Sequence, residues 1–314
     1  MFGREVNALA RPEVEQAILD AEELAAVRQV STWRTLLESL LHNVPAMLSV
    51  VFLLILVAVA ILAPYVAPHN PLQGFVQGLT SQGAPVPPGK TFLLGTDENG
   101  RDILSRMIYG ARVSLTIGIV ANGIAIVIGV MVGMVAGYFG GWIDTLLMRV
   151  TDVVMAFPIL LLAIALIAVT GPSITNIILV IALIYWVNMA RVVHGMVLSL
   201  KEREFVTATR TLGVGPWRIL FRHILPHLSS AIIVYGSLGV ATTVLLEASL
   251  SYIGIGVPVP MPSWGNMIAE GQATYQVAPW LLIYPGIALV LTVLAFNLIG
   301  DWLRDALDPM QEGK

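Results

Sequence analysis

The chain has no cysteine among its 314 residues, which excludes disulfide bridges and thiolate metal sites. Charge is scarce as well. Asp, Glu, Lys and Arg make up 12% of the residues, hydrophobic residues make up 57%, and the mean hydropathy is +0.82. A soluble protein of this length needs more polar surface than that. The composition therefore predicts an integral membrane protein, in which the position of each charge matters more than the net charge of −3.

Sequence patterns that would support catalysis are missing too. No GxxxxGK[ST] phosphate-binding loop occurs, so we expect this chain not to bind ATP itself. The five histidines lie in loops or at the edges of apolar runs, without HExxH spacing or a Ser/His pair at membrane depth: His42, His69, His194, His223 and His227. An integral-membrane enzyme such as an intramembrane hydrolase is thus poorly supported. A secondary transporter usually carries broken helices and more ionisable groups near the midplane, where only Asn122 is clear here.

Long uncharged runs are what the sequence does have. About 20 residues are needed to cross the hydrocarbon layer. The run from Val153 to Ala190 is too long for one span, and Gly171-Pro172-Ser173 divides it. The pattern predicts an all-α membrane protein with six spans, at residues 46–63, 113–135, 153–170, 174–193, 227–250 and 280–299. The polar residues 137–152 are interpreted as a short turn between the second and third spans.

Polar segments flank these spans, and they set the domain boundaries that we expect. These are an amphipathic N-terminal segment (1–45), the first span (46–64), a loop (65–112), a five-helix core (113–303) that contains residues 200–226, and a tail (304–314). Residues 1–44 carry many acids and no apolar run, so no cleavable signal is predicted. Helices are expected from Pro12 and around Trp33, the second of them at the membrane interface.

The loop before the second span and the segment after the fifth carry further local predictions. Asp97 or Asn99 is expected to cap a short helix, with Asp102 and Arg106 as an i,i+4 pair. A short helix is expected at Trp264–Glu270. We interpret these acids as parts of a folded surface loop, because no metal or catalytic role follows from them.

Three features inside the spans attract attention. Gly129, Gly133 and Gly137 recur every four residues, and such a small-residue stripe favours close helix packing over substrate contact. Asn122 lies in the middle of the second span and Glu247 near one end of the fifth. Both are candidates for a translocation path, because polar groups at membrane depth are costly. For Glu247 a structural hydrogen-bonding role is the alternative.

The longest polar island in the second half of the chain is Leu200–Pro226, LKEREFVTATRTLGVGPWRILFRHILP. It holds five basic side chains against two acidic ones, as expected of a cytoplasmic loop. A helix is expected from about Arg203 to Leu212, ended by Gly213 or Gly215 at positive φ. A second helix, Trp217–Ile224, would start after Pro216 and stop before Pro226. The prediction is a helix–turn–helix elbow across the membrane surface.

This stretch resembles the EAA loop of ABC importer permeases, with Gly213 at the motif glycine and Leu225-Pro226 at its end. Thr207-Ala208-Thr209 stand where the family has Glu-Ala-Ala, and His223 replaces an Ile. Three more stretches are similar to signatures of the C-type subunits of dipeptide, oligopeptide and nickel permeases, in the family's order: FLLGTDENGRDILSRMIYGARVSL from residue 92, EASLSYIGIG from residue 247, and DWLRDALDPM at 301–310.

The resemblance implies the six-helix fold of a type I ABC importer permease. It implies a permease subunit that forms half of a translocation pathway for di- or oligopeptides, with nickel or another small solute as the alternative cargo. The elbow would be the coupling helix seated on an ATPase subunit, through Thr207, Ala208, Thr209, Arg210, Gly213, Trp217, Leu225 and Pro226. No cofactor is expected in this chain, since ATP and Mg²⁺ would bind to the partner ATPases.

The implied partners are a paralogous permease subunit, two ABC ATPases, an extracytoplasmic substrate-binding protein and the lipid bilayer, with no nucleic acid. The expected location is the bacterial or archaeal plasma membrane. Six spans place both termini on the side of the basic elbow, which is the cytoplasm. Lys90, Arg101, Arg106 and Arg112 then lie outside, in a long loop that translocates despite its charge. The sequence names neither the cargo nor the residues that line the path.

Overall fold

The computed structural model describes residues 32–307, with side chains from residue 37 onward. It divides into two compact units, residues 1–47 and 48–314. The described part of the smaller unit contains α2 (Thr32–His42) and the start of α3 (Val44–Ile61). The helix expected around Trp33 is therefore confirmed as α2. The helix expected from Pro12 lies outside the described residues.

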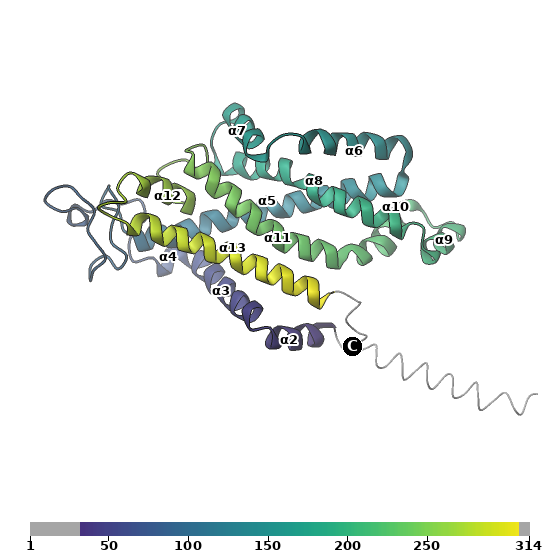
Figure 1. Ribbon diagram of the computed structural model, residues 1–314, viewed down its shortest axis with the longest axis horizontal. Coiled ribbons are helices and arrows are strands. Elements are labelled where there is room, and N and C mark those ends of the chain that lie inside the picture. Colours follow the sequence, from purple (N-terminus) through teal and green to yellow (C-terminus); the bar gives the residue numbers. More distant parts are fainter. Residues whose placement is uncertain (1–31, 308–314) are drawn as a thin grey trace, which may run out of the picture. The chain divides into compact units, whose positions relative to one another are not determined.

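The larger unit is helical, and the described residues add only isolated β-bridges within segment 74–102. Its helices are α4 (Ala63–Val66), α5 (Ile103–Phe139), α6 (Gly141–Met155), α7 (Ile159–Thr170), α8 (Ile174–Leu200), α9 (Glu204–Thr211), α10 (Pro216–Ile219), α11 (Leu225–Tyr252), α12 (Trp264–Gln272) and α13 (Trp280–Ala306) (Figure 1). Five helical stretches of the described chain are long and apolar enough to cross a membrane, and α6 with α7, bent by 91°, make a sixth if they count as one span. The all-α membrane fold is thus confirmed.

Helix α5 begins ten residues earlier than the predicted second span, because Asp102 caps it. The Asp102 carboxylate accepts the backbone N–H of Ser105 at 3.0 Å, which satisfies one of the free donors of the first turn. The predicted span excluded this part of the helix because Arg106 and Arg112 interrupt the apolar run. With 37 residues, α5 is about 55 Å long at 1.5 Å per residue, well over the thickness of the hydrocarbon layer.

The glycine stripe of α5 packs against α8, as predicted. A Cβ added at Gly129 would lie 2.5 Å from the carbonyl oxygen of Trp186, and one at Gly133 would lie 2.5 Å from that of Ala190. At Gly137 it would lie 2.9 Å from Val197 Cβ. These glycines let two backbones approach each other more closely than any side chain would allow.

The prediction of a polar turn over residues 137–152 is wrong, because Gly141–Met155 is the helix α6. Its two acidic residues pair with α8. Asp144 Oδ1 lies 2.8 Å from His194 Nε2, and Asp152 Oδ1 lies 2.5 Å from an Arg191 guanidinium nitrogen. The break comes later, at 156–158, and Gly171 at φ +84° then separates α7 from α8 as predicted.

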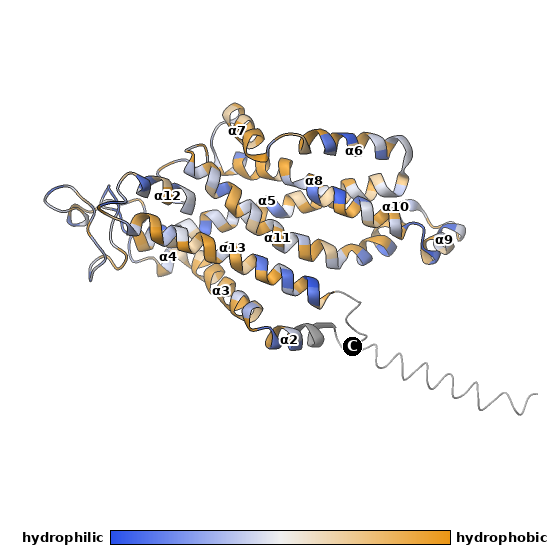
Figure 2. Ribbon diagram, in the orientation of Figure 1, coloured by the Kyte–Doolittle hydropathy of each residue, from blue (hydrophilic) through white to orange (hydrophobic). Residues whose placement is uncertain are grey.

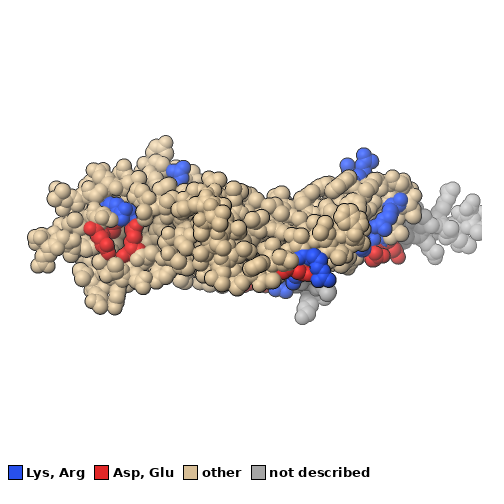
Figure 3. Space-filling model, turned by 90° about the horizontal axis from the view of Figure 1, so that it is seen from above, with Lys and Arg blue, Asp and Glu red and all other residues tan. Residues whose placement is uncertain are grey.

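Apolar residues dominate the long helices of the larger unit, and polar ones gather in α9 and in segment 65–102 (Figure 2). On the face seen in Figure 3, charged side chains lie toward the two ends and leave the middle uncharged. The two largest of its buried apolar clusters pack the long helices and the elbow together. One joins α5, α7, α8 and α11, and the other fixes α9, α10 and the start of α11 to α5 and α8. We call the ends of the bundle the elbow end, at α9, and the loop end, at α12 and segment 65–102.

Candidate functional site

The elbow has the predicted helix–turn–helix form. Helix α9 ends where Gly213 takes φ +76°, a conformation that favours glycine, and α10 starts at Pro216. The turn is closed by backbone hydrogen bonds from Gly213 N–H to Arg210 O at 3.1 Å and from Val214 N–H to Thr209 O at 3.3 Å. The choice between Gly213 and Gly215 is also settled, because Gly215 has φ −64°.

One face of the elbow is buried in the bundle and the other is free. Val206 and Ile219 are buried in the second apolar cluster. Leu212 is 81% exposed and Trp217 is 52% exposed. Thr207, Ala208 and Arg210 are exposed as well, whereas Thr209 is half-buried and donates its hydroxyl to the carbonyl of Phe205. An exposed leucine and tryptophan beside arginines form a surface suited to a protein partner.

The second helix of the elbow does not stop before Pro226, which corrects the prediction. Helix α10 continues through a π-helical turn, Leu220–Ile224, directly into α11. Proline has no N–H to donate, and Pro226 follows directly after the π-helical turn as the second residue of α11. Leu225 and Pro226 therefore lie at the base of a membrane helix, and the elbow joins that helix rigidly.

The elbow is also fastened to the last turn of α5. The Arg210 guanidinium lies 5.2 Å from the centre of the Tyr138 ring, and the Phe139 and Trp217 rings lie 5.8 Å apart, edge to face. Lys201 Nζ donates to the carbonyl of Gly137 at 2.9 Å, near the negative end of the α5 dipole. A force applied to the elbow would therefore act on α5 and α11 together.

A cavity of about 420 Å³ lies between α5, α8 and α11, and we call it the membrane cavity. Its lining is apolar with a few neutral hydrogen-bonding groups, namely those of Asn122, Tyr185, Asn188, Tyr235 and Thr242. Arg191 is the single charged residue of the lining, and its partner Asp152 neutralises it. The cavity thus offers hydrogen bonds without net charge.

Asn122, predicted as a path residue, does line this cavity. Its Nδ2 donates to the carbonyl of Gly236 on α11 at 2.7 Å, so its side chain also joins two helices. The contact is close enough that a Cβ at Gly239 would lie 2.2 Å from Asn122 Oδ1. Sequence reasoning missed the other polar lining residues. Tyr185 and Asn188, three apart in a span free of charge, were a signal that was available.

Glu247 does not line the cavity and lies toward the loop end. Its carboxylate is fully buried, and it accepts hydrogen bonds from the hydroxyls of Ser114 at 2.8 Å and Ser251 at 2.7 Å. The Ser251 hydroxyl in turn accepts the backbone N–H of Val257 at 3.1 Å. Glu247 thus holds α5, α11 and the turn after α11 together, which favours the structural alternative.

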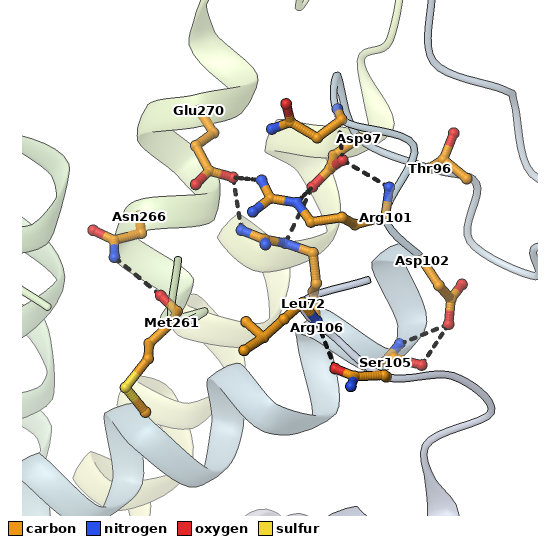
Figure 4. A network of polar contacts seen from close by, with 12 residues as sticks. Leu72, Thr96, Asp97, Arg101, Asp102, Ser105, Arg106, Met261, Asn266 and Glu270 are labelled. Atoms are coloured by element: carbon orange, nitrogen blue, oxygen red, sulfur yellow. Dashed lines mark hydrogen bonds and ion pairs between the residues drawn. The ribbon is translucent and has the colours of Figure 1, made fainter. Parts of the chain in front are cut away.

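Arg106 pairs with other partners than the predicted Asp102. Its guanidinium lies 2.7 Å from Glu270 on α12 and 3.3 Å from Asp97, and Arg101 contacts the same two carboxylates at 3.2 and 2.6 Å (Figure 4). Asp97 also closes a turn, since it accepts the N–H groups of Asn99 and Arg101 at 2.9 Å each. We call Asp97, Arg101, Arg106 and Glu270 the outer network. No group of His, Asp or Glu suited to a metal ion occurs among residues 32–307.

Comparison with known proteins places this arrangement in a family. The model of the family described as "Binding-protein-dependent transport system inner membrane component" matches residues 129–312, and "N-terminal TM domain of oligopeptide transport permease C" matches residues 31–84. The dipeptide transport system permease protein DppC of Alkalihalophilus pseudofirmus is 40% identical over 288 residues, covering 89% of this chain and 90% of the relative. The glutathione transport system permease protein GsiD of Escherichia coli O157:H7 is 41% identical over 299 residues, covering 95% and 97%.

A solved structure agrees on the fold. A chain of the methionine ABC transporter MetNI, described as inward facing, has a TM-score of 0.55 at 18% identity, covering 66% of this chain and 98% of its own. At that identity the likeness speaks for the fold alone. The family models and the two relatives show the family that the sequence resembled. The chain belongs to the binding-protein-dependent transport system inner membrane components, the multi-pass membrane permeases of ABC importers.

Proposed function

We propose that this chain is one of two paralogous permease subunits of an ATP-driven importer of di- or oligopeptides. The names of the relatives, a dipeptide and a glutathione permease, support the peptide as cargo. The chemistry of the membrane cavity supports it too. A peptide carries amide donors and acceptors and little net charge, which matches a lining of Asn, Tyr and Thr on an apolar ground.

The membrane cavity is half of the path in this proposal, and the paralogous subunit supplies the other half. Asn122 is a path residue because its amide lies at the cavity wall. Glu247 stands apart from the cavity, so its contribution is to hold the packed end together. The chain itself performs no hydrolysis, and ATP and Mg²⁺ bind to the two ATPase subunits.

The elbow is the proposed ATPase contact, and its exposed face is the observation that carries the proposal. Thr207, Ala208, Arg210 and Trp217 lie on or beside that face, and Gly213 sets the turn that presents it. The elbow end is then cytoplasmic and the loop end extracytoplasmic, where the substrate-binding protein docks. This orientation places both termini in the cytoplasm and agrees with the basic residues of the elbow.

Two glycines of the elbow provide a matched test. A Cβ at Gly213 or at Gly215 would meet no atom within 4 Å, so the two positions differ in backbone angle and not in space. Gly213→Val forces a β-branched residue into positive φ, at a cost of roughly 1–2 kcal/mol. Gly215→Val keeps an ordinary φ. We expect Gly213→Val to reach the membrane but to lose ATPase retention in a pull-down, and Gly215→Val to retain it. Equal retention would refute the coupling role.

The cargo is tested by transport. In proteoliposomes that contain ATP, the complete complex with its binding protein is expected to take up a labelled dipeptide. It is expected not to take up Ni²⁺. Uptake of Ni²⁺ without uptake of the dipeptide would refute the peptide cargo and support nickel instead. The permease chain reconstituted without partner proteins is expected to hydrolyse no ATP and to transport nothing.

A further inference from the structure

The outer network buries an arginine at the loop end of the bundle. The Arg106 side chain is 0% exposed, although it carries a permanent charge. Its charge is compensated by Glu270 at 2.7 Å and Asp97 at 3.3 Å, and Nε and Nη1 make no hydrogen bond to the described residues. Arg106 therefore depends on these two carboxylates.

The network joins two segments that adjoin in the sequence to a third that lies 164 residues further on. Asp97 belongs to segment 65–102, Arg106 to the first turn of α5, and Glu270 to α12 (Figure 4). Glu270 is the only charged residue of α12, so the helix has one ionic attachment to its surroundings. That attachment is off-centre, near the C-terminal end of the helix. At the other end α12 is held by neutral packing.

Helix α12 covers the loop end closely. A Cβ at Gly265 would lie 2.4 Å from the carbonyl oxygen of Ala248, so α12 rests directly on the α11 backbone. The Trp264 indole is buried and donates to the carbonyl of Met107 on α5 at 3.3 Å. Ala248, beneath α12, is only 4% exposed. Separation of the ends of α5 and α11 therefore requires that α12 be displaced.

We propose that Arg106 and Glu270 are positioning residues that form a latch. The latch holds α12 closed over the ends of α5 and α11, and the two side chains separate whenever this end opens to admit substrate. The inference rests on the proposed function, because it takes the loop end as the entrance. The pair is suited to separation, because Glu270 is 31% exposed and so partly hydrated already, whereas Arg106 keeps Asp97 when Glu270 leaves. Tight apolar packing alone would provide no state in which the contact to α12 is broken while Arg106 still has a partner.

A cysteine at Ala248 reports the opening, since the chain has no other cysteine. In the complete complex in right-side-out vesicles, we expect A248C to react slowly with an impermeant maleimide. A248C with E270Q is expected to react at least tenfold faster, because the near-isosteric amide removes the charge without changing the packing. ATP hydrolysis without the binding protein is expected to rise at least threefold, which a purely structural role would not produce. The matched control is A248C with Q272A. This change removes only the neutral hydrogen bond that Gln272, on the same helix, accepts from the Tyr252 hydroxyl.

The pair itself is tested by a double-mutant cycle. If Arg106 and Glu270 act as one latch, R106Q with E270Q labels no faster than E270Q alone, because the change at Glu270 already removes its contacts with both Arg106 and Arg101. Additive rates would overturn the pairing. Unchanged labelling in E270Q would overturn the latch. Should E270Q not reach the membrane, R106K replaces it. Lysine keeps the charge but lacks the planar fork, so an intermediate rate is expected and a wild-type rate would contradict the proposal.

These outcomes are independent of the proposed function. If the wild-type complex transports peptide and labelling stays slow in every variant, the latch is refuted and the permease role stands. If the wild-type complex transports nothing, the proposed function is refuted whatever the labelling shows. A cysteine at Gln82, in the exposed part of segment 65–102, confirms that the reagent reaches this side.

Discussion

The two ends of the helix bundle are built in opposite ways. At the loop end, α5 and α11 are tied by Glu247 and Ser114, covered by α12 and closed by the outer network. In the middle of the bundle α5, α8 and α11 line the membrane cavity, and at the other end the elbow leaves Leu212 and Trp217 exposed. Both ends use α5 as a common element. Charged and hydrogen-bonded contacts thus close the loop end, whereas the elbow end presents an exposed apolar surface.

A reversed orientation in the membrane would contradict the roles assigned to the two ends most directly. A cysteine at Gln82, near the loop end, is expected to react completely with an impermeant reagent added outside, and one at Thr207 in the elbow not at all. Both residues are exposed, so access to the aqueous phase decides the result. Labelling by a permeant reagent serves as the control for reactivity. The opposite pattern would place the closed end in the cytoplasm.

The next largest effect is expected from overfilling the closed end. Gly265→Ala puts a methyl group 2.4 Å from the backbone oxygen of Ala248, which cannot move without shifting α11. We expect the free energy of unfolding to fall by about 3 kcal/mol, within the range measured for overpacked cores. Gly123→Ala on α5 is the control, because a Cβ there meets nothing within 4 Å. The midpoints of thermal unfolding of the two variants in detergent are the measurement. Similar midpoints would show that α12 is loosely seated.

A smaller effect is expected at Glu247. Replacement by Leu leaves the hydroxyls of Ser114 and Ser251 without their acceptor in a buried site, at a cost of about 2 kcal/mol. Replacement by Gln keeps an acceptor and should cost less than half of that. Thermal unfolding again measures the difference. Uptake separates the two roles considered for Glu247: if Glu247→Gln is stable but does not transport, the carboxylate belongs to the path after all.

The smallest change in stability is expected in the cavity. Asn122→Ala removes one hydrogen bond to Gly236, worth about 0.6 kcal/mol in a membrane interior. It also removes a polar group from the wall, so peptide uptake is expected to fall several-fold while the unfolding midpoint hardly changes. Thr243→Val is the comparison, because the Thr243 hydroxyl donates to the carbonyl of Gly118 at 3.0 Å and Thr243 does not line the membrane cavity. Equal losses of uptake in both variants would show that a side chain lining the cavity matters no more for transport than one that only packs between helices.

Local signals predicted the parts of this molecule that depend on near neighbours. Gly213 followed by Gly215-Pro216 predicted the elbow turn, and the four-residue spacing of Gly129, Gly133 and Gly137 predicted a packing face. The errors came from charge. Asp144 and Asp152 made α6 look like a turn, although each pairs with α8. The first turns of α5 were not predicted because Arg106 lowers the local hydropathy. Its partner Glu270 lies 164 residues away, outside any hydropathy window.

The sequence by itself determined that this is a helical membrane protein, where most of its long apolar helices lie, and that a basic elbow with a glycine turn separates two of them, whereas the predicted third span is broken between α6 and α7. Those properties follow from hydrophobicity, spacing and backbone conformation, which act within one segment. Only the tertiary structure decided that Asn122 lines a cavity while Glu247 does not, and that Arg106 pairs with Glu270 and not with Asp102. The physical reason is that a buried charge or amide takes whichever partner the packing of distant helices brings within reach, and no local pattern contains that information.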